Sequence, residues 1–168
     1  MERSLLVIKP DGVQKNLVGE VLRRVEESGL RIADLKMMKT HRELLDKHYP
    51  ESMAETLGKK SEAAGDRVDD YFKQGMMVLE GLKTYLMESP VVAAIVEGDE
   101  AVKRLRGVVG YTDPASAEKG TIRGELSDDS ILEANKEKRS VRNLVHASGS
   151  VEEAQKEISL WFMDGVME

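Results

Sequence analysis

The chain has 168 residues, of which 40% are apolar and 33% charged, a composition typical of a folded globular protein. Its net charge of −6 argues against a protein that binds nucleic acid stably, but a few converging cations can still hold a nucleotide. The absence of cysteine excludes disulfides and cysteine-ligated metal sites. No apolar run approaches the roughly 18–20 residues that span a membrane, and residues 1–4 do not resemble a signal peptide. We therefore expect one cytoplasmic domain over residues 1–168.

The N-terminal segment predicts a buried strand followed by a turn and a helix. The apolar run Leu5–Ile8 indicates the strand, and proline and glycine within Lys9–Gly12 indicate the turn. From Val18 to Val25, valine and leucine recur on one face of a helix. We expect Asn16 to cap this helix and Gly29 to end it.

The middle of the chain alternates between strands and polar segments. Residues 30–38 show an imperfect strand-like alternation, and residues 42–49 form a polar helix that a proline stops. Residues 51–75 contain few apolar side chains, which predicts an exposed helical excursion and not a second domain. A helical pattern returns at 81–88, and the continuous apolar run 91–96 predicts a central strand.

The C-terminal part predicts two amphipathic helices around a last strand. Residues 101–109 form the first helix, and a loop with threonine, proline and glycine follows over 112–124. After the charged stretch 127–142, residues 143–146 indicate a short strand. The final helix begins with a capping box formed by Ser150 and Glu153.

The order of these elements, β-α-β-(α)-β-α-β, predicts an α+β protein with a ferredoxin-like βαββαβ fold. Such a fold has an antiparallel four-stranded sheet with helices packed on it. Because this fold supports many functions, the function must be argued from particular residues.

His146 is the most informative of these residues. It ends a predicted strand just before a capped helix, whose N-terminus favours anions. An unprotonated histidine nitrogen is a nucleophile near neutral pH and can accept a phosphate. The position alone also fits a half-buried structural histidine. We expect His41 and His48 to be solvated surface groups.

Four further residues could assist such a histidine. Glu157 lies on the final helix, where its carboxylate can reach back and orient the ring of His146, although it also fits an ordinary surface glutamate. Lys9, Arg106 and Arg123 each lie near the end of a predicted element and could converge on a phosphate chain. Each of the three, taken alone, also fits a solvated charge.

The sequence resembles the nucleoside diphosphate kinase family in four blocks that occur in the family's order. The segment Asn143–Ser148, followed by Glu157 and residues 158–162, is similar to the active-site signature of that family. The other blocks are residues 8–13 with 17–20, residues 89–93, and residues 112–114 with 120–124. Together they cover nearly the whole chain apart from two insertions, at approximately 51–77 and 127–141.

The resemblance implies an enzyme that transfers the γ-phosphate of a nucleoside triphosphate to a nucleoside diphosphate in a ping-pong scheme, with a phosphohistidine intermediate. It implies that His146 accepts the phosphate and that Ser148 and Glu157 position it. The implied contacts with phosphates and sugar are Lys9, Arg106, Thr112, Arg123 and Asn143, with Tyr49 near the transferred group. It also implies Mg²⁺ carried by the nucleotide phosphates without a dedicated protein site, a broad choice of base and sugar, and a homo-oligomer (dimer, tetramer or hexamer).

The chain departs from the family pattern near His146 and at the base. The family has an aspartate after the His-Gly-Ser stretch, whereas this chain has Ala147 and Gly149. The family's base-stacking aromatic falls at about Val78, so Val78 with Leu82 would hold the base. Tyr71 or Phe72 of the first insertion could do so instead, because that insertion would enlarge the helical hairpin over the nucleotide.

Two other functions remain open from the sequence. One is a non-catalytic nucleotide-binding or regulatory protein of the same fold, and the other is a phosphohistidine hydrolase that passes the phosphate to water. The presence of His146, Glu157, Lys9, Arg106 and Arg123 together favours the kinase.

Overall fold

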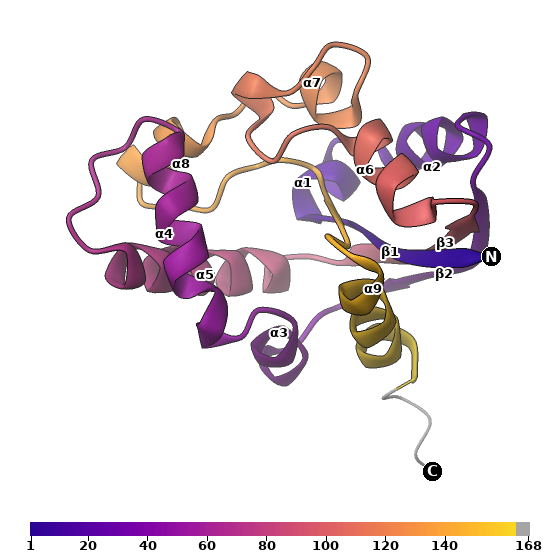
Figure 1. Ribbon diagram of the computed structural model, residues 1–168, viewed down its shortest axis with the longest axis horizontal. Coiled ribbons are helices and arrows are strands. Elements are labelled where there is room, and N and C mark those ends of the chain that lie inside the picture. The colour runs from indigo at the N-terminus through magenta and orange to yellow at the C-terminus, as the bar shows by residue number, and fades with distance from the viewer. Residues whose placement is uncertain (164–168) are drawn as a thin grey trace.

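The structure of the chain is a computed structural model that describes residues 1–163 (Figure 1). Its strands are β1 (Glu2–Ile8), β2 (Arg31–Met38), β3 (Val91–Gly98) and β4 (Val145–Ala147). Its helices are α1 (Pro10–Gln14), α2 (Val18–Glu27), α3 (Arg42–His48), α4 (Ala54–Ala63), α5 (Tyr71–Met87), α6 (Ala101–Val109), α7 (Ile122–Leu126), α8 (Ile131–Lys136) and α9 (Val151–Ile158). Short 3₁₀ turns lie at Glu51–Met53 and Pro114–Ser116, and a π-helical turn at Ser159–Met163 continues α9.

The four strands form one antiparallel sheet in the order β2-β3-β1-β4. This arrangement confirms the ferredoxin-like α+β fold expected from the sequence. The apolar run at 91–96 forms the central strand β3, in which Ile95 lies opposite Leu5 of β1. The short strand β4 pairs with the end of β1, so that His146 lies opposite Val7.

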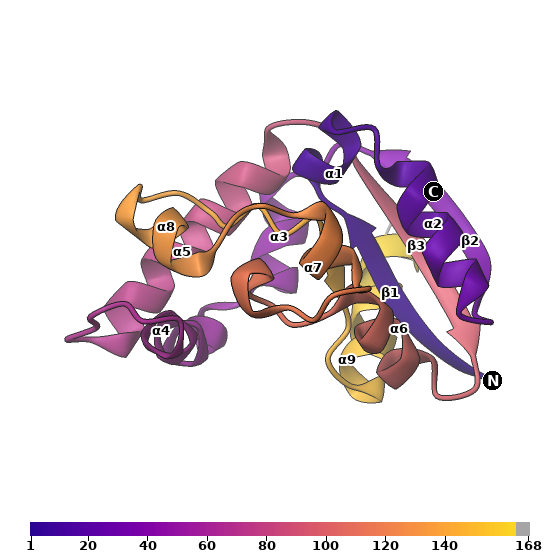
Figure 2. The ribbon, with the colours of Figure 1, turned by 90° about the horizontal axis from the view of Figure 1, so that it is seen from above.

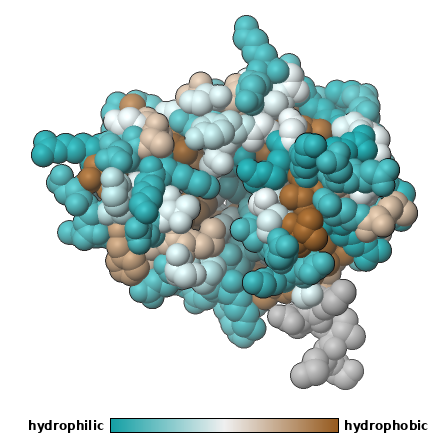
Figure 3. Space-filling view, in the orientation of Figure 1, coloured by the Kyte–Doolittle hydropathy of each residue, from teal (hydrophilic) through white to brown (hydrophobic). Residues whose placement is uncertain are grey.

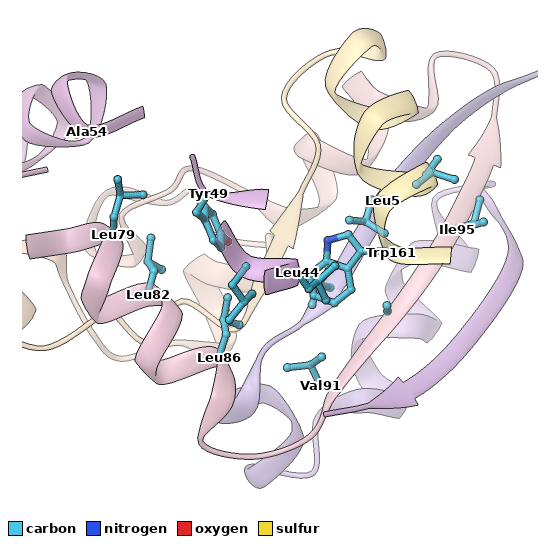
Figure 4. Packing of buried hydrophobic residues seen from close by; sticks show 14 residues of the cluster. Leu5, Leu44, Tyr49, Ala54, Leu79, Leu82, Leu86, Val91, Ile95 and Trp161 are labelled. Carbon is cyan, nitrogen blue, oxygen red and sulfur yellow. The ribbon is translucent and has the colours of Figure 1, made fainter. Parts of the chain in front are cut away.

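Both faces of β1 and β3 are buried, which explains why their sequences are apolar without alternation. On one face, Leu6 and Val92 pack against α2 and α6. On the other face, Leu5 and Ile95 pack with side chains of α3, α5, α9 and the turn that follows, including Trp161 (Figure 4). The sheet therefore has helices on both sides and holds β4 at one of its edges.

A group formed by α4, α5 and α8 extends from one side of the sheet, as Figures 1 and 2 show from two directions. Helices α4 and α5 lie backbone to backbone where they cross. A Cβ atom on Gly58 of α4 would collide with the backbone of Tyr71, and one on Gly75 of α5 would collide with the backbone of Ala54. The two glycines therefore permit a close crossing that fixes α4 against α5.

Several expectations about local structure were wrong. The turn expected at Lys9–Gly12 is the start of α1, because Pro10 occupies the first turn of a helix, where its missing N–H costs nothing. Asn16 does not cap α2; it adopts a left-handed conformation with φ of 59°, and Leu17 precedes the helix without a side-chain cap. The helix expected at 81–88 begins at Tyr71, capped by Asp70.

The excursion and the last strand also differ in detail from the expectation. Residues 51–75 contain α4 and the first turn of α5, and the charged stretch 127–142 contains α8. The last strand covers Val145–Ala147 and not 143–146, because Leu144 has a left-handed conformation with φ of 71° that interrupts the extended chain. This bend precedes His146 directly.

Candidate active site

His146 is held by a carboxylate on the helix that follows it. Its Nε2 lies 2.9 Å from Oε1 of Glu157, one of the last residues of α9. The fully buried Ser148 donates its hydroxyl to Oε2 of the same carboxylate at 2.6 Å and accepts the backbone N–H of Leu5. This chain of bonds ties the ring to the sheet and leaves Nδ1 as the ring nitrogen without a partner in the described part of the chain.

The charge on Glu157 is strongly favoured. Burial acts to raise the pKa of the Glu157 carboxyl, but interactions with His146, His48 and Ser148 outweigh it and lower the pKa to about 2. The carboxylate is therefore ionised at neutral pH. An ionised acceptor stabilises a positive charge that develops on the neighbouring imidazole.

His48 is not a solvated surface group, which corrects the expectation from the sequence. Its side chain is 1% exposed, and its Nδ1 accepts the indole N–H of Trp161 at 3.2 Å. The ring lies edge-on to that of His146, with centroids 4.6 Å apart. Burial, and next the repulsion between the two imidazoles when both are protonated, lower the pKa of His48 to about 3. His48 is therefore neutral and packs behind His146 without adding charge to the site.

Lys9, Asn143 and Arg123 form a buried polar network beside His146. The Nζ of Lys9 donates to Oδ1 of Asn143 at 2.7 Å, and the Asn143 amide donates to the carbonyl of Thr112 at 2.9 Å. The guanidinium of Arg123 donates to three carbonyls, those of Asn143, Gly110 and Val145. These bonds join segments that lie far apart in the sequence.

The two buried cations of this network lack a buried counter-ion strong enough to offset their desolvation. Burial, and then repulsion from Arg123, lower the pKa of Lys9 to about 7. Burial also lowers the pKa of Arg123 to about 10, and repulsion from Arg106 adds to this effect. An anion placed near these groups would restore their ordinary basicity, so the site is electrostatically prepared for a negative ligand.

A cavity of about 380 Å³ opens in front of His146, in the hollow between the α4–α5 group and the sheet (Figure 3). Nine of the residues expected at the site line this cavity: Lys9, Tyr49, Val78, Leu82, Arg106, Thr112, Arg123, Asn143 and His146. A second hollow of about 500 Å³ adjoins it and shares Lys60, Arg106, Thr112 and Arg123. Glu157 and Ser148 lie behind His146 and outside the cavity wall.

Part of the cavity wall is apolar. It includes Val78 and Leu82 of α5 together with Leu57, Ile131 and Val141. Tyr71 and Phe72 are not part of the cavity wall: the hydroxyl of Tyr71 donates to Glu62, and Phe72 is 49% exposed. The apolar residues are therefore the ones available to a planar ring.

Tyr49 also lines the cavity and lies near the imidazole. Its ring centroid is 6.3 Å from that of His146, and burial raises the pKa of its hydroxyl, which stays protonated. Gly149, where the family has an aspartate, donates its N–H to Glu153, while the Ser150 hydroxyl accepts the N–H of Glu153. The start of α9 is thus capped without the aspartate.

The sequence reasoning missed several residues of the site, among them His48, Val141 and Lys60. His48 could have been found from its position beside Tyr49 at a helix end, but no local pattern shows that it is buried. Lys60 lies in the first insertion and Val141 in the second, and the sequence assigned neither residue a role in the site.

Comparisons with known proteins bear on this geometry. A family model described as nucleoside diphosphate kinase matches residues 2–166. The chain is similar to a nucleoside diphosphate kinase of Pyrobaculum aerophilum, with 39% identity covering 98% of this chain and 96% of the relative. It is also similar to nucleoside diphosphate kinase 1 of Arabidopsis thaliana, with 39% identity covering 98% and 90% of the two chains. The chain belongs to the nucleoside diphosphate kinase family.

Solved structures of the nucleoside diphosphate kinase family agree with the fold. A crystal structure of the P. aerophilum enzyme has a TM-score of 0.89 and 38% identity and covers 99% of both chains. A structure of the Borrelia burgdorferi enzyme, described as a transition-state mimic with bound vanadate and ADP, has a TM-score of 0.83 and 32% identity. It covers 99% of this chain and 90% of that one. As a member of this family, the chain is a nucleotide-binding phosphotransferase. None of its described helices is long and apolar enough to cross a membrane.

Proposed function

We propose that this kinase transfers the γ-phosphate of a nucleoside triphosphate, typically ATP, to a nucleoside diphosphate through phosphorylated His146. The observation that carries the proposal is the orientation of one ring. Nε2 of His146 is hydrogen-bonded to Glu157, which leaves Nδ1 for the substrate. His146 lines the cavity together with Lys9, Arg106 and Arg123. A nucleophile held beside a set of cations is the arrangement that phosphoryl transfer requires.

The first half-reaction uses the lone pair of Nδ1. It attacks the γ-phosphorus as the bond from that phosphorus to the β–γ bridging oxygen breaks, so the nucleoside diphosphate leaves with the bridging oxygen and the electron pair of the broken bond. The positive charge that appears on the imidazole is shared with the ionised Glu157 through the Nε2–H bond. The second half-reaction is the reverse with a different diphosphate, whose terminal oxygen attacks the phosphohistidine.

We assign the phosphate and sugar contacts to Lys9, Arg106, Thr112, Arg123 and Asn143, all of which line the cavity. Cations and neutral donors at fixed positions stabilise the charge that spreads over the transferring phosphoryl oxygens. Tyr49 lies close enough to His146 for its protonated hydroxyl to face the transferred group.

Val78 and Leu82 would hold the nucleobase. They belong to the apolar part of the cavity wall and contribute only aliphatic surface. Because aliphatic contacts do not read the hydrogen-bonding edge of a base, this wall supports a broad choice of base.

The described side chains of the protein do not offer Mg²⁺ a site of their own, but they fit a Mg²⁺ ion that arrives bound to the nucleotide. Mg²⁺ prefers oxygen ligands, whereas the one close cluster of possible ligands among residues 1–163 is His48, His146 and Glu157. Glu157 is already engaged by His146 and Ser148. Mg²⁺ would therefore be held by nucleotide phosphates, and it would neutralise their charge.

A cytoplasmic homo-oligomer is the form that we propose for the protein. Leu35 and Met37 on the edge strand β2 are 45% and 61% exposed, and unpaired strand edges with apolar side chains are surfaces that proteins cover. Sedimentation of the purified protein tests this point, and a monomer at micromolar concentration would refute it.

Incubation with γ-labelled ATP and then with a different nucleoside diphosphate tests the proposed reaction. We expect label on the protein and then on the second nucleotide, and neither in His146→Ala. His41→Asn is the matched control, because His41 is exposed and asparagine can also cap α3. Free phosphate alone would instead support a hydrolase, and an unlabelled protein would support a non-catalytic nucleotide-binding protein.

A further inference from the structure

Lys60 lies on α4, outside the blocks that resemble the family, yet it belongs to the active-site wall. It lines both the cavity in front of His146 and the adjoining hollow. Arg106, Thr112 and Arg123 are shared by the same two hollows. Lys60 therefore stands at the boundary between the hollows, together with residues assigned to the phosphates.

The charge of Lys60 is not used elsewhere in the structure. The side chains of Lys60 and Arg106 make no hydrogen bond or ion pair with any residue between 1 and 163. Partial loss of hydration, and then repulsion from Arg106 and Arg123, lower the pKa of Lys60, and attraction to Glu153 offsets this only in part. The adjacent Lys59 differs, because it pairs with Glu55 at 2.8 Å and lies over the ring of Tyr71.

Arg123 alone cannot donate hydrogen bonds to all the oxygens of a phosphate chain, because three of its N–H groups already donate to backbone carbonyls. The ammonium of Lys9 is likewise bonded to Asn143. Lys60 and Arg106 are the cations of the wall whose donors are all available to a ligand, within the part of the chain that is described. Like charges gathered in this way cost free energy until an anion enters between them.

The position of Lys60 is set by rigid packing. Helix α4 crosses α5 at Gly58 and Gly75, where the backbones touch. Gly58 lies two residues before Lys60, and α4 also contacts α8 of the second insertion. The ammonium is thus carried to the cavity on a fixed helix and not on a free loop.

We propose that Lys60 is an additional phosphate-binding residue, supplied by the first insertion, that contacts the phosphate chain of a nucleoside di- or triphosphate together with Arg106. This inference rests on the proposed function for the identity of the ligand. An insertion that closes over the nucleotide would in this way also contribute a charge to its binding.

The test is the binding of ADP with Mg²⁺ to Lys60→Ala, Lys60→Arg and Lys59→Ala, measured by calorimetry at low and high salt. We expect Lys60→Ala to weaken ADP binding by about tenfold at low salt, since a charge-assisted contact is lost, and to reduce the dependence on salt. Lys60→Arg should retain most of the affinity, and Lys59→Ala should bind like the wild type.

Equal ADP affinity in Lys60→Ala and Lys59→Ala would overturn the inference, even if the enzyme transfers phosphate normally. An equal loss in Lys60→Ala and Lys60→Arg with unchanged salt dependence would also overturn it, because it would indicate a structural role. If the wild type failed to transfer phosphate while Lys60→Ala still lost ADP affinity, the proposed function would fall and the role of Lys60 would stand.

Discussion

Replacing Glu157 by glutamine separates the charge behind His146 from the geometry. The amide oxygen of glutamine can still accept the Nε2–H of His146, and its NH2 group can donate to the Ser148 oxygen, so both contacts can form, the second with donor and acceptor exchanged. What is lost is the negative charge that balances the imidazole when Nδ1 is phosphorylated. The variant therefore tests whether this charge assists the reaction.

The structure sets the size of the effect. The fall of the Glu157 pKa from an ordinary 4.5 to about 2 corresponds to about 3 kcal/mol of net interaction with the groups around it. His146 is the strongest of these groups, and the hydrogen bond from Ser148 adds to the interaction. We therefore expect the loss of charge to cost about 1.5–3 kcal/mol in the transition state, or roughly 10- to 100-fold in the rate of phosphorylation.

The assay is single-turnover incorporation of label from γ-labelled ATP, with ADP binding measured in parallel. Glu157 does not line the nucleotide cavity, so the rate should fall while the affinity for ADP stays near that of the wild type. Glu152→Gln, an exposed carboxylate on the same helix, is the control and should phosphorylate normally. A wild-type rate in Glu157→Gln would refute the argument.

Three further predictions concern stability. Because the pKa of buried His48 is lowered to about 3 while an unfolded histidine titrates near 6.5, its stabilisation is complete above about pH 6.5 and declines as the pH falls toward 3. In urea unfolding, the free energy of unfolding should be about 2 kcal/mol lower at pH 5 than at pH 7, and His48→Asn should lack this difference. An unfolding free energy that is the same at both pH values in the wild type would contradict this. Gly75→Ala should destabilise the crossing of α4 and α5 by about 1–3 kcal/mol and so lower the thermal unfolding midpoint. Gly107→Ala, where the added methyl group meets open space, should not lower it. Equal midpoints in the two variants would show that α4 and α5 separate freely. Tyr85→Phe removes the hydroxyl that bonds both the N–H and the carboxylate of Asp11 and should cost about 1–3 kcal/mol in urea unfolding, and an unchanged midpoint would indicate that water replaces it.

Local patterns in the sequence determined which segments form the framework. The apolar runs of β1 and β3 predicted buried strands because a strand covered on both faces has no polar side. The capping box at Ser150 predicted the start of α9, because the bond between its hydroxyl and the N–H of Glu153 joins residues three positions apart. These interactions are local, so the order of amino acids is enough to reveal them.

The motif residues around His146 could also be recognised from the sequence, but their arrangement could not. Lys9 and Asn143 are 134 positions apart and meet only because β4 pairs with β1 and the chain bends at Leu144. The orientation of the His146 ring, with Nε2 on Glu157, likewise depends on where Glu157 lies after α9 has packed on the sheet.

The insertions show where the sequence alone reached its limit. Their composition of charged and small residues predicted an exposed excursion, whereas the backbone contact at Gly58 and Gly75 holds α4 against α5 and brings Lys60 to the cavity. His48 was misjudged for the same reason, since a polar helix end gives no sign that Trp161 and the sheet will cover it. Burial and convergence arise from contacts between distant segments, so only the tertiary structure decided them.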